Sequence, residues 1–343
     1  MTHHALRLRL DTDALQSNWR WLDRVSGSRA GAAVKADGYG LGAIEVTKRL
    51  GEAGCRDFFV SNWAEAKALG RLPEGASLSV LHGVGPDDVA AALSGIARPV
   101  LNTPLQVARW KGIAPGVAVD VMVDTGMNRL GIRTDELELL DGLTIDTLLS
   151  HLASADEGSA LNQIQLDRFR AVKAAVPARR YSLANSAGIC LGTDYGFDLV
   201  RPGLALYGGL PREEARGHIR QVATPEAEVI QRRTVKAGES IGYGATWVAE
   251  RDTEAAILNV GYADGYLRDF AGAGAAMVDG RRLPLIGRVS MDLIAVDCSN
   301  APGLAEGDWA ALDYDLPSAA AQSGLSQYEL LTGLSDRFER VWS

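Results

Sequence analysis

The sequence predicts an α/β protein: a (β/α)8 (TIM) barrel over residues 11–212, with a mainly β domain built from residues 1–10 and 213–343. Three observations predict this fold. Short apolar runs alternate with helix-like segments over about 200 residues, as in parallel β/α units. Almost every run ends in a polar residue able to do chemistry. From about Pro211 the helices give way to β-like runs with glycine turns, which indicates a second domain.

The first domain contains enough candidate strands to close a barrel: 31–34, 58–60, 78–81, 99–101, 117–123, 145–149, 181–183 and 198–200. The helix-like segments include 43–50, 64–69, 87–93, 105–110, 135–140, 159–176 and 186–191. A doubly wound sheet would show the same alternation, but its polar residues would cluster at one switch point. Here they end nearly every run: Lys35, Asn62, His82, Asn102, Asp124 with Arg129, His151, Asn185 with Ser186, and Arg201 with Gly203.

The N-terminal segment and the second domain also have patterns that predict secondary structure. Residues 6–10 alternate leucine with arginine, which predicts a strand rather than a signal peptide, and we expect it to pair with the second domain. A helix capped by Asp11 or Thr12 should follow to about Val25. The second-domain runs are 227–230, 255–260, 275–278, 283–286, 293–296 and 309–312, and residues 328–331 look helical.

Composition excludes several classes of protein. A net charge of −8 gives no basic field for phosphate backbones, so nucleic acid is not an expected partner. The three cysteines are isolated, which predicts neither a disulfide framework nor a metal site. No apolar run approaches the length of about 18 residues that a membrane span needs. We therefore expect a cytoplasmic protein.

Lys35 is the first candidate for chemistry. The apolar run 32–34 delivers it into a glycine-broken turn before a helix, which places it at the mouth of a β/α unit. Partial desolvation there would favour the neutral amine and make Lys35 a candidate Schiff-base nucleophile. The alternative is a solvated lysine at a strand end.

The loops after the seventh and eighth candidate strands suggest a phosphate site, since barrels of this class often bind phosphate there. They read Asn185-Ser186-Ala187-Gly188 and Arg201-Pro202-Gly203-Leu204. A serine at a helix start and exposed glycine amides suit a phosphate dianion, although the first stretch alone could be a plain helix cap. Combined with a strand-end lysine, these loops suggest pyridoxal 5′-phosphate as cofactor.

A series of motifs extends this interpretation over nearly the whole chain. They are Val-Lys-Ala-Asp-Gly-Tyr-Gly at 34–40, Asp-Thr-Gly-Met-x-Arg-x-Gly at 124–131, Ser-His-x-Ala at 150–153, Ala-Asn-Ser at 184–186, Arg-Pro-Gly-x-Ala-x-Tyr-Gly at 201–208, Gly-Tyr-x-Ala-Thr at 242–246, Gly-Tyr-Ala-Asp-Gly-Tyr at 261–266 and Gly-Arg-Val-x-Met-Asp at 287–292. Together, and in this order, they resemble the signature of bacterial alanine racemases.

The resemblance implies an isomerase that interconverts L- and D-alanine by two-base proton transfer on a pyridoxal-phosphate aldimine, in D-alanine biosynthesis for the cell wall. Lys35 would hold the cofactor and act as the base on the D-side face. Tyr262, from the other subunit of a homodimer, would act on the L-side face. The resemblance implies three further sets of contacts. The phosphate would be bound by Tyr39, Ser186 and the backbone of Gly203 and Leu204. Arg201 would contact the pyridine nitrogen, with a hydrogen-bonded relay through His151, and Arg129 and the Met291 amide would bind the substrate carboxylate.

Arg201 is an unusual partner for a pyridine nitrogen. An arginine cannot readily give up its proton, so the ring nitrogen would stay largely unprotonated and the cofactor would be a weaker electron sink. The alternative for Arg201, on the residue alone, is a surface or structural ion pair.

Two departures from the family pattern affect the site. Many members carry a carbamylated lysine two residues before the Asp-Thr-Gly element, where this chain has Met122. Taking Arg129 to be buried, we expect an anion such as chloride, or a rearranged side chain, beside it. The family often has a tyrosine in the last segment, whereas residues 333–343 contain none and place Asp336 or Phe338 nearby.

Three other functions stay open at this stage. The same machinery could act on serine or another small amino acid, because an apolar pocket discriminates weakly against one added group. A non-catalytic pyridoxal-phosphate carrier would lack the second domain. A dinucleotide enzyme is suggested by Gly38-Tyr39-Gly40-Leu41-Gly42, but the third glycine comes one residue too early and the lysine is left unexplained.

Overall fold

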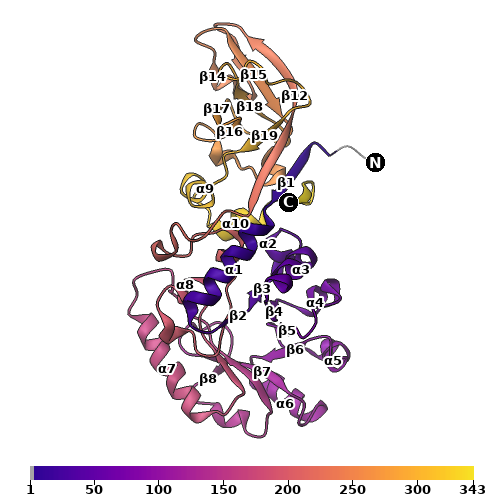
Figure 1. Cartoon of the computed structure of the whole chain (residues 1–343), viewed down its shortest axis with the longest axis vertical. Coiled ribbons are helices and arrows are strands. Elements are labelled where there is room, and N and C mark those ends of the chain that lie inside the picture. Colours follow the sequence, from indigo (N-terminus) through magenta and orange to yellow (C-terminus); the bar gives the residue numbers. More distant parts are fainter. Residues whose placement is uncertain (1–3) are drawn as a thin grey trace. The chain divides into compact units, whose positions relative to one another are not determined.

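The computed structural model describes residues 4–343 and divides the chain into two compact units. One unit comprises Asp13–Arg220, and the other joins the N-terminal segment up to Thr12 with Gln221–Ser343. We call them the barrel unit and the β unit and describe each by itself (Figure 1). The sequence analysis placed the two boundaries after residues 10 and 212.

The barrel unit has a closed parallel sheet. In spatial order its strands are β3 (Ala32–Ala33), β4 (Asp57–Val60), β5 (Ser77–Val80), β6 (Arg98–Leu101), β7 (Val119–Asp124), β9 (Ile145–Leu149) and β10 (Arg180–Ser182). Strand β11 (Leu199–Val200) pairs with β2 (Arg29–Ala30), which continues into β3 after Gly31. Backbone bonds from Asp198 to Tyr181 (3.0 Å) and from Arg201 to Ala184 (2.9 Å) join β11 to β10. This closure confirms the (β/α)8 barrel and excludes the doubly wound sheet.

Helices surround these strands (Figure 1). They are α1 (Thr12–Ser26), α2 (Lys35–Tyr39), α3 (Ala43–Ala53), α4 (Trp63–Leu69), α5 (Val89–Leu93), α6 (Pro104–Ile113), α7 (Leu161–Ala175) and α8 (Ser186–Ile189). Helix α1 buries Leu15, Trp19 and Leu22, the stripe that its sequence predicts. The helix expected at 135–140 is only a 3-10 turn, Leu137–Leu140, because Asp141 leaves the helical conformation and Gly142 is left-handed (φ 80°).

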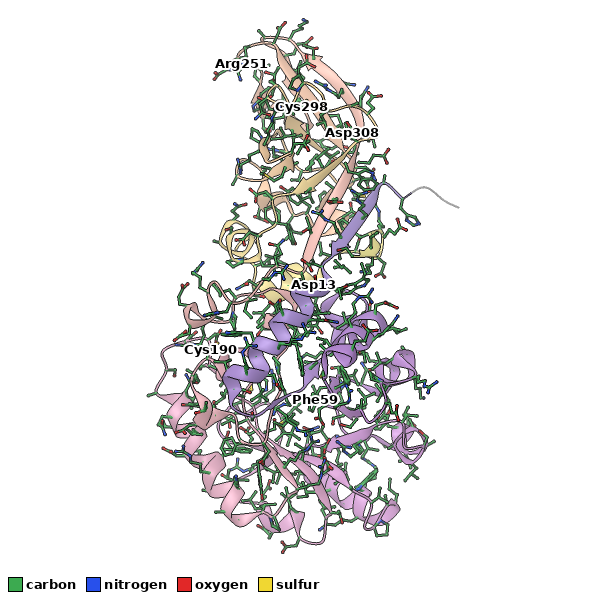
Figure 2. All side chains as sticks on the ribbon, viewed as in Figure 1. Asp13, Phe59, Cys190, Arg251, Cys298 and Asp308 are labelled. Atoms are coloured by element: carbon green, nitrogen blue, oxygen red, sulfur yellow. The ribbon has the colours of Figure 1, made fainter. Side chains whose placement is uncertain are left out.

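The barrel interior is a packed apolar core. Phe59, Val100, Met122, Leu149 and Leu199 come from five different strands and are all buried in one cluster. Figure 2 labels Phe59 inside the barrel. Such a layer of inward side chains fills the barrel, so ligands can bind only at its ends.

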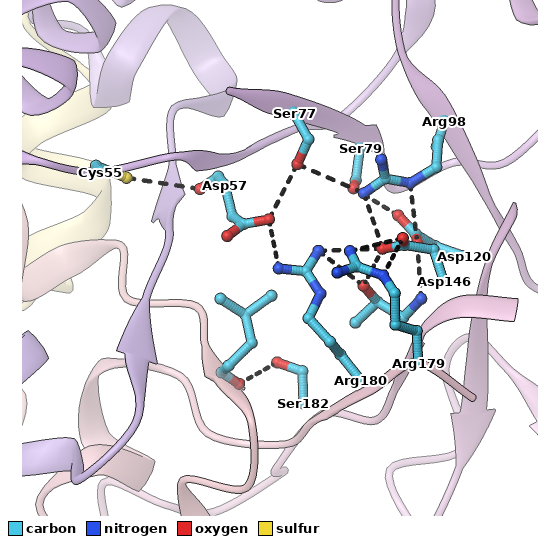
Figure 3. A network of polar contacts seen from close by, with 12 residues as sticks. Cys55, Asp57, Ser77, Ser79, Arg98, Asp120, Asp146, Arg179, Arg180 and Ser182 are labelled. Carbon is cyan, nitrogen blue, oxygen red and sulfur yellow. Dashed lines mark hydrogen bonds and ion pairs between the residues drawn. The ribbon is translucent and has the colours of Figure 1, made fainter. Parts of the chain in front are cut away.

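A network of charges closes the end of the barrel at which the strands begin (Figure 3). We call Asp57, Arg98, Asp120, Asp146, Arg179 and Arg180 the basal network. The Arg180 guanidinium lies between Asp57 (2.8 Å) and Asp146 (3.1 Å). Arg98 contacts Asp146 (3.2 Å) and Asp120 (3.3 Å), whose side chain is fully buried. Charges at this end are therefore paired within the barrel itself.

The β unit is a closed antiparallel sheet with two helices. Strand β12 (Ala223–Val235) pairs with β15 (Thr253–Leu258) and β19 (Trp309–Leu312), and β18 (Ile294–Asp297), β17 (Arg281–Ile286) and β16 (Ala275–Val278) complete the ring. Strand β1 (Leu6–Leu10) pairs antiparallel with β12, as its pattern led us to expect, and parallel with β20 (Glu339–Trp342). The remaining elements are the hairpin β13 (Ser240–Ile241) and β14 (Trp247–Val248) and the helices α9 (Leu316–Ser323) and α10 (Gln327–Thr332).

The cysteines are distributed over both units and are free. Cys298 lies in the β unit, and Cys190 lies in the barrel unit with Cys55 (Figure 2). Within residues 4–343, no helix is long and apolar enough to cross a bilayer, and no group of three His, Cys, Asp or Glu side chains is arranged to hold a metal ion.

Candidate active site

Lys35 follows strand β3 and opens a left-handed turn. Ala36, Asp37, Gly38 and Tyr39 have φ values of 51°, 51°, 63° and 57°. A left-handed residue other than glycine costs about 1–2 kcal/mol, so the surroundings must hold this turn in place. Glu65 accepts the Ala36 amide (2.9 Å), and the Asp37 carboxylate accepts the Ala43 amide at the start of α3 (2.8 Å).

The surroundings of Lys35 favour its neutral amine. Burial lowers the pKa of Lys35, nearby Arg129 lowers it further, and Glu65 opposes them. The Glu65 carboxylate is already engaged by two backbone amides, those of Ala36 (2.9 Å) and Ser61 (2.6 Å). At neutral pH a larger fraction of Lys35 is therefore unprotonated than of a solvated lysine, and the unprotonated amine is the form that attacks a carbonyl or accepts a proton.

Tyr39 lies against Gly203 at the opposite side of this turn. A Cβ on Gly203 would come 2.1 Å from the Tyr39 hydroxyl oxygen, so only glycine allows this approach. The Tyr39 ring stacks on Tyr207 at 4.6 Å, and the Tyr207 hydroxyl donates to the Ala33 carbonyl (2.7 Å). The phenol of Tyr39 is thus held beside the buried backbone of Gly203, in the loop after β11.

Ser186 links the two loops in which the sequence predicts a phosphate site. Its hydroxyl oxygen accepts the amides of Gly203 (2.9 Å) and Ala205 (3.2 Å). Asn185 caps α8 by accepting the Gly188 amide (2.9 Å), so the plain-cap interpretation is right for Asn185 but not for Ser186. Leu204, whose backbone is also a predicted phosphate contact, lies between Gly203 and Ala205 and begins the 3-10 turn Leu204–Tyr207.

Arg201 is buried without an ion pair. Only 6% of the residue is exposed, and its guanidinium donates to the Ser182 hydroxyl and the Ser150 carbonyl, both at 2.5 Å. Burial lowers the pKa of Arg201 to about 10, with Asp120 opposing, so it stays protonated at neutral pH. Because no carboxylate of residues 4–343 pairs with it, the structural ion-pair interpretation is wrong.

His151 follows strand β9 and is partly buried. Burial lowers the pKa of His151 to about 3, and the positive charges of Arg201, Arg129 and Lys35 act in the same direction. The ring is therefore neutral at pH 7, and its unprotonated nitrogen can accept a hydrogen bond. Across the described chain no hydrogen bond joins the His151 ring to the Arg201 guanidinium, so the relay between them stays a prediction.

Arg129 is exposed, which corrects the assumption that it is buried. The Asp124 carboxylate shapes its loop by accepting the amides of Gly126 and Met127, both at 2.8 Å. Met122 lies below in the apolar core of the barrel. An exposed cation pays no penalty for a buried, unpaired charge, so Arg129 does not require an anion beside it in the single chain. Whether chloride binds there stays a prediction.

Two supporting residues escaped the sequence analysis. Glu65 holds the lysine turn, and its place three residues after the cap Asn62 fits a capping-box position that could have drawn attention to it. Gln165 on α7 is fully buried; it accepts the Ala153 amide (2.8 Å) and donates to the His151 carbonyl (2.9 Å). A buried glutamine in a helix has no local sequence signal.

The β unit carries the other two predicted residues on neighbouring segments. Tyr262 lies in the 3-10 turn Tyr262–Asp264, partly buried, with the Arg268 guanidinium 4.9 Å from its ring centre. Met291 is 53% exposed, and its carbonyl accepts the Ala263 amide (3.0 Å). The Met291 amide donates to no residue within 4–343, which leaves it available for a ligand.

Comparisons with known proteins agree over both units. The alanine racemase N-terminal domain family matches residues 10–211, and the alanine racemase C-terminal domain family matches residues 222–342. An alanine racemase of Acidiphilium cryptum is 39% identical over 97% of this chain and 98% of its own length. A catabolic alanine racemase of Agrobacterium fabrum is 41% identical over 98% of this chain and 91% of its own.

Solved structures show the same likeness. The alanine racemase of Bartonella henselae, described with covalently bound pyridoxal phosphate, superimposes with a TM-score of 0.90 at 33% identity. The superposition covers 99% of this chain and 100% of that one. The biosynthetic alanine racemase of Pseudomonas aeruginosa gives a TM-score of 0.86 at 32% identity, with the same coverage.

Proposed function

Because this chain belongs to the alanine racemase family, we propose that it interconverts L- and D-alanine with pyridoxal 5′-phosphate, using Lys35 and Tyr262 as two bases. The observation that carries the proposal is Lys35: a partly buried amine whose pKa is lowered, at the carboxyl end of a barrel strand. The two loops in which we expect the phosphate to bind follow β10 and β11 of the same barrel, which supports the proposal.

The residues present fit the cofactor. The hydroxyls of Tyr39 and Ser186 and the backbone of Gly203 and Leu204 would hold the phosphate. Ser186 already orders this loop by accepting the amides of Gly203 and Ala205, and glycine at 203 lets the Tyr39 hydroxyl approach it. When bound, the cofactor supplies an aldehyde that condenses with an amine and a conjugated ring that acidifies the α-proton of the amino acid. Arg201, fixed by Ser182 and Ser150, would lie at the ring nitrogen and leave it unprotonated.

The two bases act on opposite faces of the amino acid. Lys35 takes the α-proton from D-alanine or returns it, and its lowered pKa provides the neutral amine that this step requires. Tyr262 does the same on the L-side. Arg129 and the Met291 amide would hold the substrate carboxylate, since both are accessible and neither is engaged with a carboxylate of the described chain.

We infer further that the enzyme is a cytoplasmic homodimer in which Tyr262 and Met291 complete the site of the other subunit. The family likeness over both units supports the shared site. A role in D-alanine supply for the cell wall belongs to the same inference. The biosynthetic and catabolic enzymes of Agrobacterium fabrum are 39% and 41% identical to this chain, so similarity does not separate those two roles.

Exchange of Tyr262 for phenylalanine tests the two-base assignment. Tyr262→Phe should lose racemisation from both enantiomers, because the equilibrium constant of a racemase is one and both directions share each base. It should still exchange the α-hydrogen of D-alanine with deuterated water, because Lys35 is intact. Proton NMR in deuterated buffer measures the exchange, and circular dichroism measures racemisation.

Lys35→Ala is the matched variant and should lose both exchange and racemisation. A mixture of Lys35→Ala and Tyr262→Phe subunits should regain activity if sites are shared, since one site of the mixed dimer is then intact. Full racemisation by Tyr262→Phe would refute the assignment, and failure of the mixture to regain activity would refute the shared site.

A further inference from the structure

We propose that Arg337 is a positioning residue for racemisation: its guanidinium ties together the two segments that carry Tyr262 and Met291, and so fixes the base relative to the amide that holds the substrate carboxylate. This inference rests on the proposed function. Every contact that supports it lies within the β unit, so it does not depend on how the two units are placed.

The segments of Tyr262 and Met291 are paired through their backbones. The Tyr262 amide donates to the Ser290 carbonyl, and the Ala263 amide donates to the Met291 carbonyl, both at 3.0 Å. The hydroxyl of Ser290 donates to the Leu293 carbonyl (2.7 Å) and closes the turn that presents Met291. Tyr262 and Met291 thus lie on neighbouring segments that are joined by backbone hydrogen bonds.

Glycines allow the Tyr262 turn to be packed from two sides. A Cβ on Gly261 would come 2.3 Å from the Met291 carbonyl oxygen, and one on Gly265 would come 2.6 Å from the Gly333 carbonyl oxygen. Both distances are shorter than real contacts, so neither position accepts a side chain. The turn is enclosed between the Met291 segment and the start of the C-terminal segment 333–338.

Arg337, in that C-terminal segment, reaches both of the other segments. Its Nε lies 3.2 Å from the Asp264 carboxylate in the Tyr262 turn. Its Nη1 donates to the carboxylate of Asp292, the residue after Met291, at 2.8 Å. One planar guanidinium with a fixed fork of donors therefore sets the spacing of the two carboxylates, which a lysine would do less well.

The inner of these two carboxylates holds the turn itself. The Asp264 side chain is fully buried; one oxygen accepts the Gly261 amide (3.0 Å) and the other accepts the Ser335 hydroxyl (3.3 Å) and contacts Arg337. Burial raises the pKa of Asp264, and the Gly261 amide and the Arg337 charge are among the groups that oppose the rise. Removing Arg337 would thus weaken the carboxylate that caps the Tyr262 turn.

Relative placement matters here because both groups act on one small molecule. The α-carbon and the carboxylate carbon of alanine are adjacent atoms, so Tyr262 and the Met291 amide must reach neighbouring atoms together. A misplacement of about 1 Å at such a site can cost about 10²-fold in rate. The outer contact with Asp292 is exposed at both partners, and its contribution is alignment rather than stability.

The test compares Arg337→Gln with Arg337→Lys and with Arg340→Gln as the matched control. Arg340 lies three residues away and contacts Asp336 (3.7 Å) and the Phe338 carbonyl (3.1 Å), outside the Tyr262 turn. We expect kcat/KM to fall about 10²-fold in Arg337→Gln, to fall less in Arg337→Lys, and to stay within about twofold of wild type in Arg340→Gln.

Isotope effects separate positioning from simple loss of folded enzyme. If Arg337→Gln slows the Tyr262 step alone, the primary isotope effect should rise with α-deuterated L-alanine and fall towards one with α-deuterated D-alanine. Exchange of the D-alanine α-hydrogen through Lys35 should continue at the wild-type rate. A smaller fraction of folded enzyme would lower every rate together and leave both isotope effects unchanged, which would overturn the proposal.

Asp292→Asn provides a second variant for the case in which Arg337→Gln does not fold. It removes only the outer carboxylate, and we expect the same isotope pattern with a loss of about 3- to 10-fold in kcat/KM. Wild-type isotope effects and rates in this variant would refute the proposal. If the wild-type enzyme itself exchanged no α-hydrogen of either alanine, the proposed function would fail first, which is a distinguishable result.

Discussion

At the amino-terminal ends of the barrel strands, Arg98 and Arg180 lie between carboxylates, whereas at the carboxyl-terminal ends Lys35 and Arg201 pair with no carboxylate of residues 4–343. Both ends are built from the same strands. The difference teaches that the basal end pairs its charges within the chain, which stabilises it. The other end leaves the Lys35 amine and the Arg201 guanidinium without a paired carboxylate, at a cost in stability, and so leaves them for a ligand.

The largest expected effect separates two buried arginines by the same substitution. Arg180→Met should lower the free energy of unfolding by about 3–5 kcal/mol, because it leaves the buried Asp57 without its cation, whereas Asp146 keeps Arg98 and Arg179. Arg201→Met should lower it by only about 1 kcal/mol, because it removes hydrogen bonds to neutral oxygens and also removes a desolvated charge. Urea unfolding of the two variants without added cofactor measures both changes.

Activity should show the reverse order. Arg201→Met should lose most racemisation, whereas folded Arg180→Met should keep the wild-type KM. The basal network (Figure 3) lies where the strands begin, and Lys35 follows the carboxyl end of β3. Arg133→Met is the control, since Arg133 and Asp135 are both exposed, and its unfolding midpoint should be unchanged. Equal stability losses in Arg180→Met and Arg201→Met would contradict the contrast between the two ends.

The sequence predicted the features that depend on local pattern. The apolar runs located the barrel strands to within one or two residues, and the polar residues after them located Lys35, His151 and Arg201. Strands of the β unit were predicted equally well, since the runs at 275–278 and 309–312 have the same bounds as β16 and β19. Alternation and turn residues carry such information directly.

Features that depend on contacts between distant residues could not be predicted. The left-handed turn after Lys35 is held by Glu65 from another helix, and only Gly38 signals it locally. The exposure of Arg129 depends on where its loop lies, which its motif does not specify. Arg337 and Asp264 are 73 positions apart in the sequence, and no periodic pattern connects them.

A pH titration sharpens the comparison at the cationic end. The pKa of His151 lies at about 3 in the folded chain and at about 6.5 in the unfolded chain, so below pH 6.5 the unfolded chain binds a proton that the native chain does not. Stability should therefore fall as the pH drops from 6.5 towards 3, with a slope from this group of at most about 1.4 kcal/mol per pH unit.

His151→Gln should remove that part of the slope. The exposed His82, which contacts Ser61 at 3.0 Å, provides the control exchange His82→Gln. Urea unfolding between pH 7 and pH 5 compares the three proteins. An unchanged slope in His151→Gln would show that burial and the neighbouring cations do not keep His151 neutral.

The smallest expected effect concerns backbone strain rather than charge. Ala36 is exposed and left-handed, so Ala36→Gly removes a steric cost and should stabilise the chain by about 0.5–1 kcal/mol. The same exchange at Ala64, which is exposed on α4, should destabilise by a similar amount because glycine weakens a right-handed helix. The same left-handed turn positions Lys35, and glycine would make that turn more flexible. We therefore expect Ala36→Gly to raise stability and to lower turnover. Destabilisation by Ala36→Gly would contradict the claim that the left-handed conformation of Ala36 costs stability.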